Sequence, residues 1–254
     1  MKWVRARQST REIFGTLEED RLSVHEGDMF AGATPTGETL ALADLAFLPP
    51  VRPGKFVGLW NNFHAAAAKN GWAVPAEPLY FLKGANAIAA HQSEIAMPSD
   101  DIGRVFYEGE LGIVIGKTCK AATPEQAAAA IFGYTCVNDV TAFELIARDA
   151  SFAQWARAKS FDGFGPLGPV VAVGLDPHSL VVRTRVNGRE RQNYPVSDMI
   201  FGPASLVERL SRDMTLEPGD VIACGTSLGA LPVKAGTLVE VEIDGIGVLA
   251  NRFV

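Results

Sequence analysis

The chain has 254 residues, of which 48% are hydrophobic, and it carries a formal net charge of −6. This excess of acidic groups argues against nucleic acid as a partner, and the apolar runs are shorter than the ~20 residues that a membrane span needs. The N-terminal segment Met1–Arg7 also lacks the apolar stretch of a secretory signal. The three cysteines, Cys119, Cys136 and Cys224, are scattered through apolar segments and indicate reduced thiols in a cytoplasmic protein.

Residues 1–50 are expected to form a small N-terminal domain. Short strand-like pieces alternate with turns there, as in Ile13–Val24. The proline-rich stretch Leu48–Pro53 is typical of a linker. Residues 51–254 then form the main domain, which is long enough to bury a sizeable core.

Beyond this linker the pattern predicts few helices and many short strands. Helical segments are expected after His64, after Pro124, over 140–150 and over 203–212. The clearest turn-and-strand signals lie at 216–222 and 236–243, and the second of these alternates apolar and polar residues with period two. Pattern alone therefore predicts a β-rich α+β fold.

Two glutamates one residue apart, Glu108 and Glu110, run directly into the apolar, β-branched segment 111–115. Side chains at i and i+2 lie on the same face of a strand, so the two carboxylates are expected to point the same way. A buried strand that begins with two like charges needs a compensating group, most simply a bound cation. The alternative is an exposed end of an edge strand, where the same pair needs no ligand.

A third carboxylate, Asp139, ends another short apolar strand. Between the two strands, Thr123 and Gln126 stand at the N-cap and capping-box positions of a short helix, with Pro124 in its first turn. Three carboxylates suit Mg²⁺, Mn²⁺ or Ca²⁺, whereas zinc favours histidine and cysteine. The four histidines and three cysteines show no H-x-x-x-H or C-x-x-C spacing, which argues against a zinc or iron–sulfur site.

Six short motifs follow one another from Val57 onward. They are Gly58–His64, Tyr80–Lys83, Glu108–Glu110, Asn138–Ala142, Lys159–Pro169 and Gly225–Thr226. Each motif alone is weak, but in this order they are highly specific, and the chain resembles the fumarylacetoacetate hydrolase family. The resemblance implies a mixed-sheet β-roll with a small N-terminal domain, assembled as a homodimer.

The resemblance also implies a cofactor, Mg²⁺ (or Mn²⁺ or Ca²⁺), held by Glu108, Glu110 and Asp139. Enzymes of this family cleave, decarboxylate or isomerise 2-oxo acids and related 1,3-dicarbonyl compounds. A 2-oxo carboxylate can chelate such an ion, which then acts as a Lewis acid on the carbonyl. We therefore expect a small-molecule 2-oxo acid substrate.

Further site roles follow from the same resemblance. Lys159 is expected to lie beside the metal and to stabilise the oxyanion that develops on the substrate. His64 is the expected proton shuttle, because an imidazole can take or return a proton at physiological pH. Substrate-binding roles are assigned to Lys83, Arg148 and Thr226. The alternatives are a solvated surface lysine for Lys159 and ordinary turn chemistry for Thr226.

Two positions depart from the family pattern. Hydrolases and decarboxylases of this family usually carry a glutamate three residues after the histidine, where this chain has Ala67. Many members also carry an arginine where this chain has Phe143; either Arg148 reaches the same place after an insertion or the arginine role is absent. Loss of the His–Glu pair weakens water-activating hydrolysis more than enolisation or decarboxylation. A base could also come from Glu77.

The expected function is a divalent-metal-dependent enzyme of 2-oxo acid or aromatic-ring-fission catabolism, acting by C–C bond hydrolysis, decarboxylation or enol–keto isomerisation. One alternative is a non-catalytic, metal-dependent binder of a small dicarboxylate, which the missing glutamate and arginine favour. Another is phosphoryl transfer, but the chain lacks a G-x-x-x-x-G-K-[ST] phosphate loop. The loop 71–76 is expected to contribute to the pocket as a lid.

Overall fold

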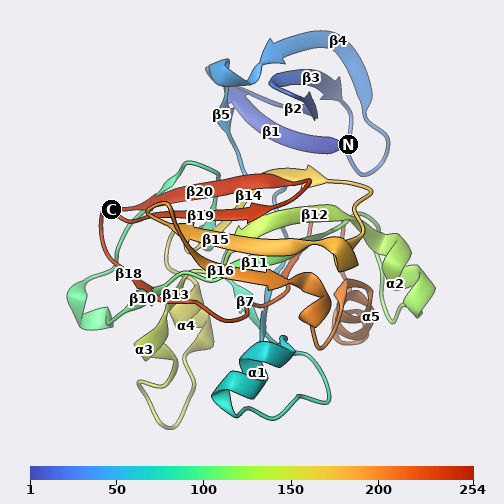
Figure 1. The fold of residues 1–254 in the computed structure, drawn as a ribbon. Helices are drawn as coiled ribbons and strands as arrows, with labels where there is room; N and C mark the ends of the chain where they lie inside the picture. The colour runs from blue at the N-terminus through green and yellow to red at the C-terminus, as the bar shows by residue number, and fades with distance from the viewer.

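The computed structural model describes residues 1–254, and strands make up most of its regular structure (Figure 1). The strands are β1 (Lys2–Gln8), β2 (Arg11–Glu18), β3 (Arg21–Glu26), β4 (Thr34–Ala41), β5 (Ala46–Phe47), β6 (Phe56–Trp60), β7 (Leu79–Lys83), β8 (Ile88–Ala89), β9 (Glu94–Ile95), β10 (Val105–Phe106), β11 (Gly109–Ile115), β12 (Ile131–Asn138), β13 (Thr141–Ala142), β14 (Gly165–Ala172), β15 (Val181–Val186), β16 (Arg189–Pro195), β17 (Val221–Ala223), β18 (Pro232–Val233), β19 (Leu238–Ile243) and β20 (Gly247–Phe253). The helices are α1 (His64–Asn70), α2 (Pro124–Ala130), α3 (Phe143–Ile146), α4 (Trp155–Lys159) and α5 (Pro203–Asp213). None of them is long and apolar enough to cross a membrane. The predicted β-rich α+β class is confirmed.

Strands β1 to β5 form the N-terminal part of the chain, drawn in blue at the top of Figure 1. β1, β2, β3 and β4 follow one another as antiparallel neighbours. β1 joins this sheet to the rest of the molecule, because Lys2 pairs with Ala172 of β14 and Trp3 pairs with Val171. The predicted boundary after residue 50 falls between β5 and β6, and the division into two domains stays a prediction.

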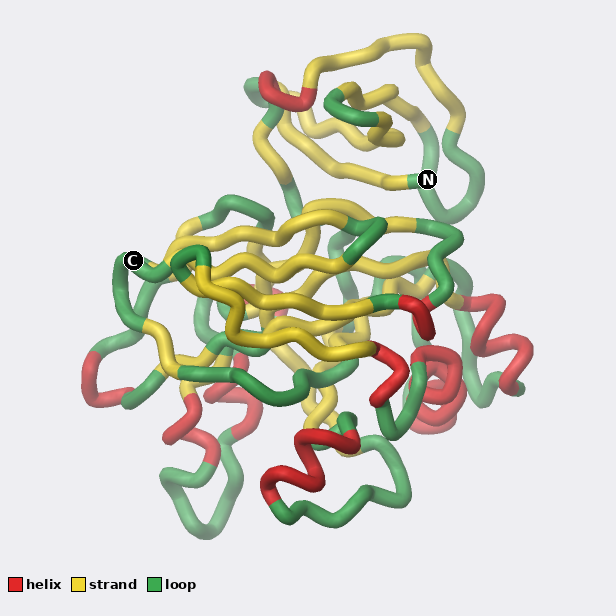
Figure 2. Tube along the Cα trace, viewed as in Figure 1, coloured by secondary structure: helices red, strands yellow, loops and turns green.

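Two large sheets enclose the main core. The larger runs in the order β4-β3-β2-β1-β14-β12-β11-β17-β6-β7, and a five-stranded sheet has the order β16-β15-β19-β20-β9. Figure 2 shows the yellow strands stacked in the body of the molecule and the red helices at its margins. The core draws on both sheets, with Leu111 and Ile113 from β11 and Val241 and Ile243 from β19.

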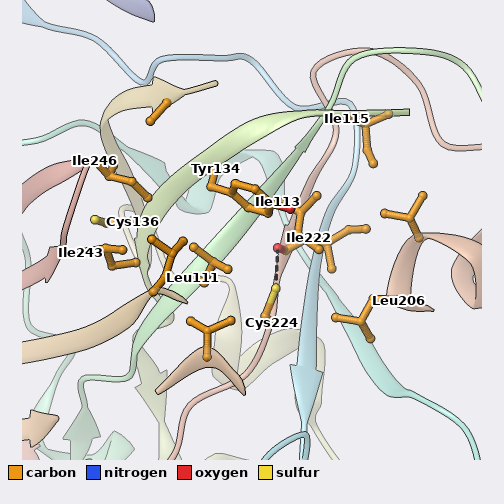
Figure 3. Close-up of a cluster of buried hydrophobic side chains, with 14 of the residues drawn as sticks. Leu111, Ile113, Ile115, Tyr134, Cys136, Leu206, Ile222, Cys224, Ile243 and Ile246 are labelled. Atoms are coloured by element: carbon orange, nitrogen blue, oxygen red, sulfur yellow. Dashed lines mark hydrogen bonds between the residues drawn. The ribbon is translucent and has the colours of Figure 1, made fainter. Parts of the chain in front are cut away.

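The side chains of strand β11 alternate between two faces, one in the main core and one that carries Glu110. Leu111, Ile113 and Ile115 point into the main core, where Figure 3 shows them among side chains of neighbouring strands. Glu110 belongs to the opposite face, on which Val114 packs into a second hydrophobic cluster. All seven residues of β11 are buried, so the strand carries a carboxylate into the interior.

Three predicted elements are confirmed in detail. At the start of α2, Thr123 Oγ1 accepts a hydrogen bond from the Gln126 N–H and Gln126 Oε1 accepts one from the Thr123 N–H, which completes the capping box. Helix α5 matches the helix expected over 203–212. Strand β19 lies within 236–243 and alternates buried and half-buried side chains, as its period-two pattern predicts.

The helix predicted over 140–150 is wrong at both ends, because only residues 143–146 are helical. Thr141 and Ala142 form β13, which pairs with β10, and only a four-residue helix, α3, follows. Val140 and Thr141 are β-branched, and strand pairing overrides the helical pattern there. Helix α4 has no sequence signal at its start, where Gln154 makes no side-chain capping bond.

Candidate metal centre and active site

The antiparallel pairing of β11 with β12 brings three carboxylates together. Gly109 lies opposite Asn138, and the Asp139 N–H donates to the Glu108 carbonyl over 2.8 Å. The start of β11 therefore lies beside the end of β12, because the strands run in opposite directions. One oxygen from each of the carboxylates of Glu108, Glu110 and Asp139 lies within 4.8 Å of the others. The three predicted ligands thus form one cluster in space.

Two buried lysines lie against this carboxylate cluster. Lys159 Nζ donates to Glu108 Oε2 at 2.7 Å and also to Asp139 Oδ2. Lys83 Nζ donates to Asp139 Oδ1 at 2.5 Å and to the Val140 carbonyl at 3.2 Å. Both carboxylate oxygens of Asp139 are therefore engaged by ammonium groups. With all groups ionised, the negative charges outnumber the positive ones.

Burial and neighbouring charges set the pKa values in the cluster. Burial raises the pKa of Glu110 well above its usual range, and the charges of Asp139 and Glu108 raise it further. Burial also raises the pKa of Glu108, against the opposing effect of Lys159. For Asp139, the effect of burial is outweighed by Lys159 and Lys83, and the pKa is lowered. Burial lowers the pKa of Lys83, whereas Asp139 and Glu108 outweigh burial and raise the pKa of Lys159.

The surroundings of Glu110 test whether a metal ion fits. Its Oε2 accepts a hydrogen bond from the Gly225 N–H at 2.8 Å, whereas its Oε1 is buried and has no partner. A buried carboxylate oxygen without a partner is costly in free energy, and a cation would remove that cost. Carboxylate oxygens are the ligands that Mg²⁺, Mn²⁺ and Ca²⁺ prefer. The residues fit such an ion, which Glu108, Glu110 and Asp139 would hold.

Residues of β15 and β16 fix the peptide between the two glutamates. Gln192 Oε1 accepts a hydrogen bond from the Gly109 N–H at 3.0 Å, and its Nε2 donates to Thr226 Oγ1 at 2.8 Å. Tyr194 and Thr226 both donate to the Gly109 carbonyl. A Cβ at Gly109 would lie 2.0 Å from Thr184 Oγ1, so only glycine fits. The spacing of the flanking glutamates is thereby fixed.

We expect Gln192→Leu to weaken metal binding while the protein stays folded. Leucine has a similar size but leaves the buried Gly109 N–H without an acceptor, which lowers the free energy of unfolding by about 1–3 kcal/mol. Because Gly109 links two proposed ligands, Mn²⁺ affinity should fall by about tenfold. Isothermal titration calorimetry measures this, with the exposed neighbour Asn193→Leu as control. Equal Mn²⁺ affinity in the two variants contradicts the positioning role of Gln192.

A cavity of about 470 Å³ opens onto the carboxylate cluster. Glu108, Lys159 and Thr226 line it, while Glu110 and Asp139 are fully buried behind them. The aromatic residues in its walls are Trp60, Trp72, Phe106, Phe143 and Trp155. Apart from Glu108, no carboxylate and no histidine lines it. Its volume lies within the range of roughly 300–1,000 Å³ that is typical of small-molecule sites.

Two predicted substrate-binding residues differ in their access to this cavity. Thr226 lines it, and its hydroxyl is already bonded to Gly109 and Gln192. The side chain of Lys83 is fully buried and does not line the cavity. Its contacts make it a counter-ion of Asp139, and its role in substrate binding stays a prediction.

Two other predicted site residues lie outside the lining. His64 is exposed at the start of α1. The Arg148 guanidinium donates to the carbonyls of Asp101 and Ile102, both at 2.7 Å, while Phe143 itself lines the cavity. In this structure the Arg148 guanidinium is therefore bound outside the cavity lining. The catalytic role of His64 and the substrate-binding role of Arg148 stay predictions.

Two family models match the chain. The model for the fumarylacetoacetate (FAA) hydrolase C-terminal domain matches residues 55–254, and the Rv2993c-like N-terminal model matches residues 1–50. The chain belongs to the fumarylacetoacetate hydrolase family. The resemblance carried by the six motifs is confirmed.

Several relatives in the fumarylacetoacetate hydrolase family carry the names of enzymes. The structure of 5-carboxymethyl-2-hydroxymuconate delta-isomerase from Mycobacterium smegmatis is 36% identical, with a TM-score of 0.92 over 100% of this chain and 99% of that one. Maleylpyruvate hydrolase from Sphingobium sp. SYK-6, solved with manganese (II) ion and pyruvate, is 25% identical, with a TM-score of 0.81 over 100% and 99%. The 4-hydroxyphenylacetate degradation bifunctional isomerase/decarboxylase of Salmonella dublin is 34% identical over 95% of this chain and 58% of that protein. The chain is an enzyme of this family.

Sequence reasoning missed Gln192 and most of the aromatic residues of the cavity, although the loop 71–76, which the sequence predicts to contribute to the pocket, supplies Trp72. Gln192 lies in the polar strand β16, and its role arises only from contact with the other sheet. Of the four tryptophans in the chain, three line the cavity. Their separation along the sequence hides this grouping, although Trp60 stands inside one of the six family motifs.

Proposed function

We propose that this chain is a Mg²⁺- or Mn²⁺-dependent enzyme that decarboxylates or isomerises a 2-oxo acid. The observation that supports this most is the position of Glu108 and Lys159, which line the cavity in front of the buried Glu110 and Asp139. A cation held by the three carboxylates would supply Lewis-acid activation of the 2-oxo group. A substrate in the cavity would thus meet a carboxylate ligand and an ammonium group together.

Lys159 is placed to stabilise the negative charge that the reaction develops. Its side chain is 3% exposed and is held by Glu108 and Asp139, so it is in position before substrate binds. Enolisation and decarboxylation both place charge on the former ketone oxygen, and a pre-positioned buried donor stabilises that charge. Burial opposes protonation of Lys159, but the two carboxylates outweigh it and raise the pKa, which keeps the ammonium group charged.

Hydrolysis of a C–C bond fits the cavity less well, because no carboxylate or imidazole base other than the proposed ligand Glu108 lines the cavity to assist a metal-activated water. His64 and Glu77 are exposed and do not line the cavity. Ala67, at the position of the usual glutamate, is buried and carries no acid. Decarboxylation needs an electron sink more than a base. The proposal of His64 as proton shuttle rests on the family resemblance alone, because other residues of its helix α1 line the cavity but His64 itself does not.

We also propose a homodimer in the cytoplasm. The dimer rests on the family resemblance, and the location rests on the three buried cysteines, none of which forms a disulfide. Light scattering after size-exclusion chromatography measures the mass of the particle. A single-chain mass across micromolar concentrations contradicts the dimer.

Proton NMR in D₂O tests the proposed reaction. Oxaloacetate and acylpyruvates are incubated with Mg²⁺ and protein, with Mg²⁺ alone as the control for metal-promoted decarboxylation, and then with excess chelator. We expect protein-dependent decarboxylation, or deuterium exchange next to the ketone, that chelator stops and Mn²⁺ restores. Cleavage of an acylpyruvate into two acids indicates hydrolysis and overturns the proposed reaction. Identical spectra with and without protein contradict both proposed reactions, decarboxylation and isomerisation.

A further inference from the structure

Five aromatic side chains from separate segments meet in the cavity. Trp60 ends β6, Trp72 follows α1, and Trp155 begins α4. Phe106 of β10 and Phe143 of α3 also line the cavity, and their ring centroids are 5.1 Å apart. The fold thus gathers flat apolar surface at the mouth of the carboxylate cluster.

Three of these rings, together with the buried Phe81 outside the lining, form a series of contacts from solvent to the cluster. Trp72, which is 40% exposed, lies beside Trp60 with ring centroids 4.9 Å apart. Trp60 lies 6.2 Å from Trp155, which stacks on Phe81 at 5.4 Å with an interplanar angle of 12°. Lys159 Nζ lies 4.6 Å from the centroid of Phe81. This series of contacts therefore ends at an ammonium group of the cluster.

The cavity offers little positive charge to a second carboxylate. Lys69, in the last turn of α1, is the only charged residue in the lining besides Glu108 and Lys159. Phe143 stands where many family members have an arginine, and it is 50% exposed. A bound apolar group would bury this ring, which is favourable in proportion to the apolar area removed from water.

We propose that the substrate is a 2-oxo acid with an uncharged, planar tail, aromatic or conjugated, that lies along the path of Trp60, Trp72 and Trp155. This inference rests on the proposed function, which places the 2-oxo acid head at the carboxylate cluster. Flat rings attract a flat π system by offset stacking and edge contacts. A carboxylate tail against the same rings would lose water, and Lys69 is the one cation of the lining, apart from the one at the carboxylate cluster, that could pair with it. The half-exposed rings of Trp72 and Phe143 become buried when the tail binds.

Binding of unreactive analogues tests the tail separately from the reaction. Oxamates resemble 2-oxo acids but do not enolise or decarboxylate, so their affinity is independent of turnover. In calorimetry with Mn²⁺ and the full chain, we expect N-phenyloxamate to bind about tenfold more tightly than N-methyloxamate or N-(2-carboxyethyl)oxamate. Equal affinities overturn the inference and leave the proposed function intact. Binding of no oxamate, or binding that ignores Mn²⁺, overturns both the proposed site and the inference.

Substitutions of the half-exposed residues Phe143 and Trp72 show which side chains determine the preference for the tail. Phe143→Arg should shift the preference about tenfold toward the carboxyethyl compound, because it adds a cation at the rim. Trp72→Ala should weaken N-phenyloxamate about tenfold and leave N-methyloxamate unchanged. Phe152→Arg is the matched control, since Phe152 is 69% exposed and does not line the cavity. A wild-type preference for the carboxyethyl compound that Lys69→Gln abolishes shows an anionic tail and overturns the inference.

Discussion

Glu108→Ala is expected to abolish metal-dependent turnover while the protein stays folded. The substitution removes one of three clustered carboxylates and one partner of Lys159. Loss of a metal ligand should lower the rate by at least about 10³-fold, which corresponds to roughly 4 kcal/mol of transition-state stabilisation. The Glu108 side chain is 19% exposed, so its removal leaves no large cavity in the core. The NMR assay measures the loss of turnover, Mn²⁺ calorimetry measures the loss of metal affinity, and thermal unfolding shows whether the variant stays folded.

Two further variants make this result decisive. Glu108→Gln keeps the size of the side chain and removes its charge, so it should also be inactive, even if Glu108→Ala folds poorly. Glu94→Ala removes an exposed glutamate of β9 that belongs neither to the cavity lining nor to the carboxylate cluster, and it should leave turnover unchanged. A rate within twofold of wild type in both Glu108 variants would remove the central claim about the metal centre.

The second large effect is expected on stability, from Lys83→Met. Lys83 is fully buried against Asp139, and removal of one partner of a buried ion pair is strongly destabilising. Without metal, the free energy of unfolding should fall by about 3 kcal/mol, toward the low end because Lys159 still contacts Asp139. A cation bound to the folded state replaces the missing charge, so Mn²⁺ should restore part of the loss. Urea unfolding with chelator and with Mn²⁺ measures both values.

Lys55 provides a matched control outside the cluster. Its Nζ lies 2.7 Å from Oδ2 of Asp220, a carboxylate as buried as that of Asp139. Lys55→Met should therefore destabilise the protein by the same amount with and without Mn²⁺. If Mn²⁺ reduces the loss in Lys83→Met by no more than it reduces the loss in Lys55→Met, Lys83 does not share its charge compensation with a metal.

The carboxylate groups of the cluster could be predicted because their origin is local. Glu108 and Glu110 share a face through the two-residue period of a strand, and Asp139 ends the next strand. The capping box at Thr123 predicts a helix between those strands, but the antiparallel pairing that brings the start of β11 beside the end of β12 is seen only in the structure. Two like charges at the start of a buried strand indicate that a compensating positive group lies nearby. Periodicity and charge indicate the carboxylate groups, and the family resemblance supplies the expectation that all three share one ion.

The remaining features depend on contacts that no local pattern encodes. Gln192 contacts Gly109 of the other large sheet, and Lys83 contacts the buried Asp139. The sequences of their own strands, β16 and β7, give no sign of these contacts. The motif match placed His64 and Arg148 in the site, but the conformations of α1 and of the segment after α3 decide where those side chains lie. The early strand at Thr141 has the same cause, since its pairing partner β10 is distant in sequence.

The close approach at Gly109 ties the geometry of the proposed metal centre to the distance between the two large sheets. Thr184 of β15 and Val241 of β19 touch the space that a side chain at Gly109 would fill. Any change that moves these strands outward by a few tenths of an ångström also moves the backbone that carries both glutamates. Ligand geometry tolerates less displacement than the fold does. Core substitutions that leave all three proposed ligands in place can therefore abolish activity while the protein is still folded.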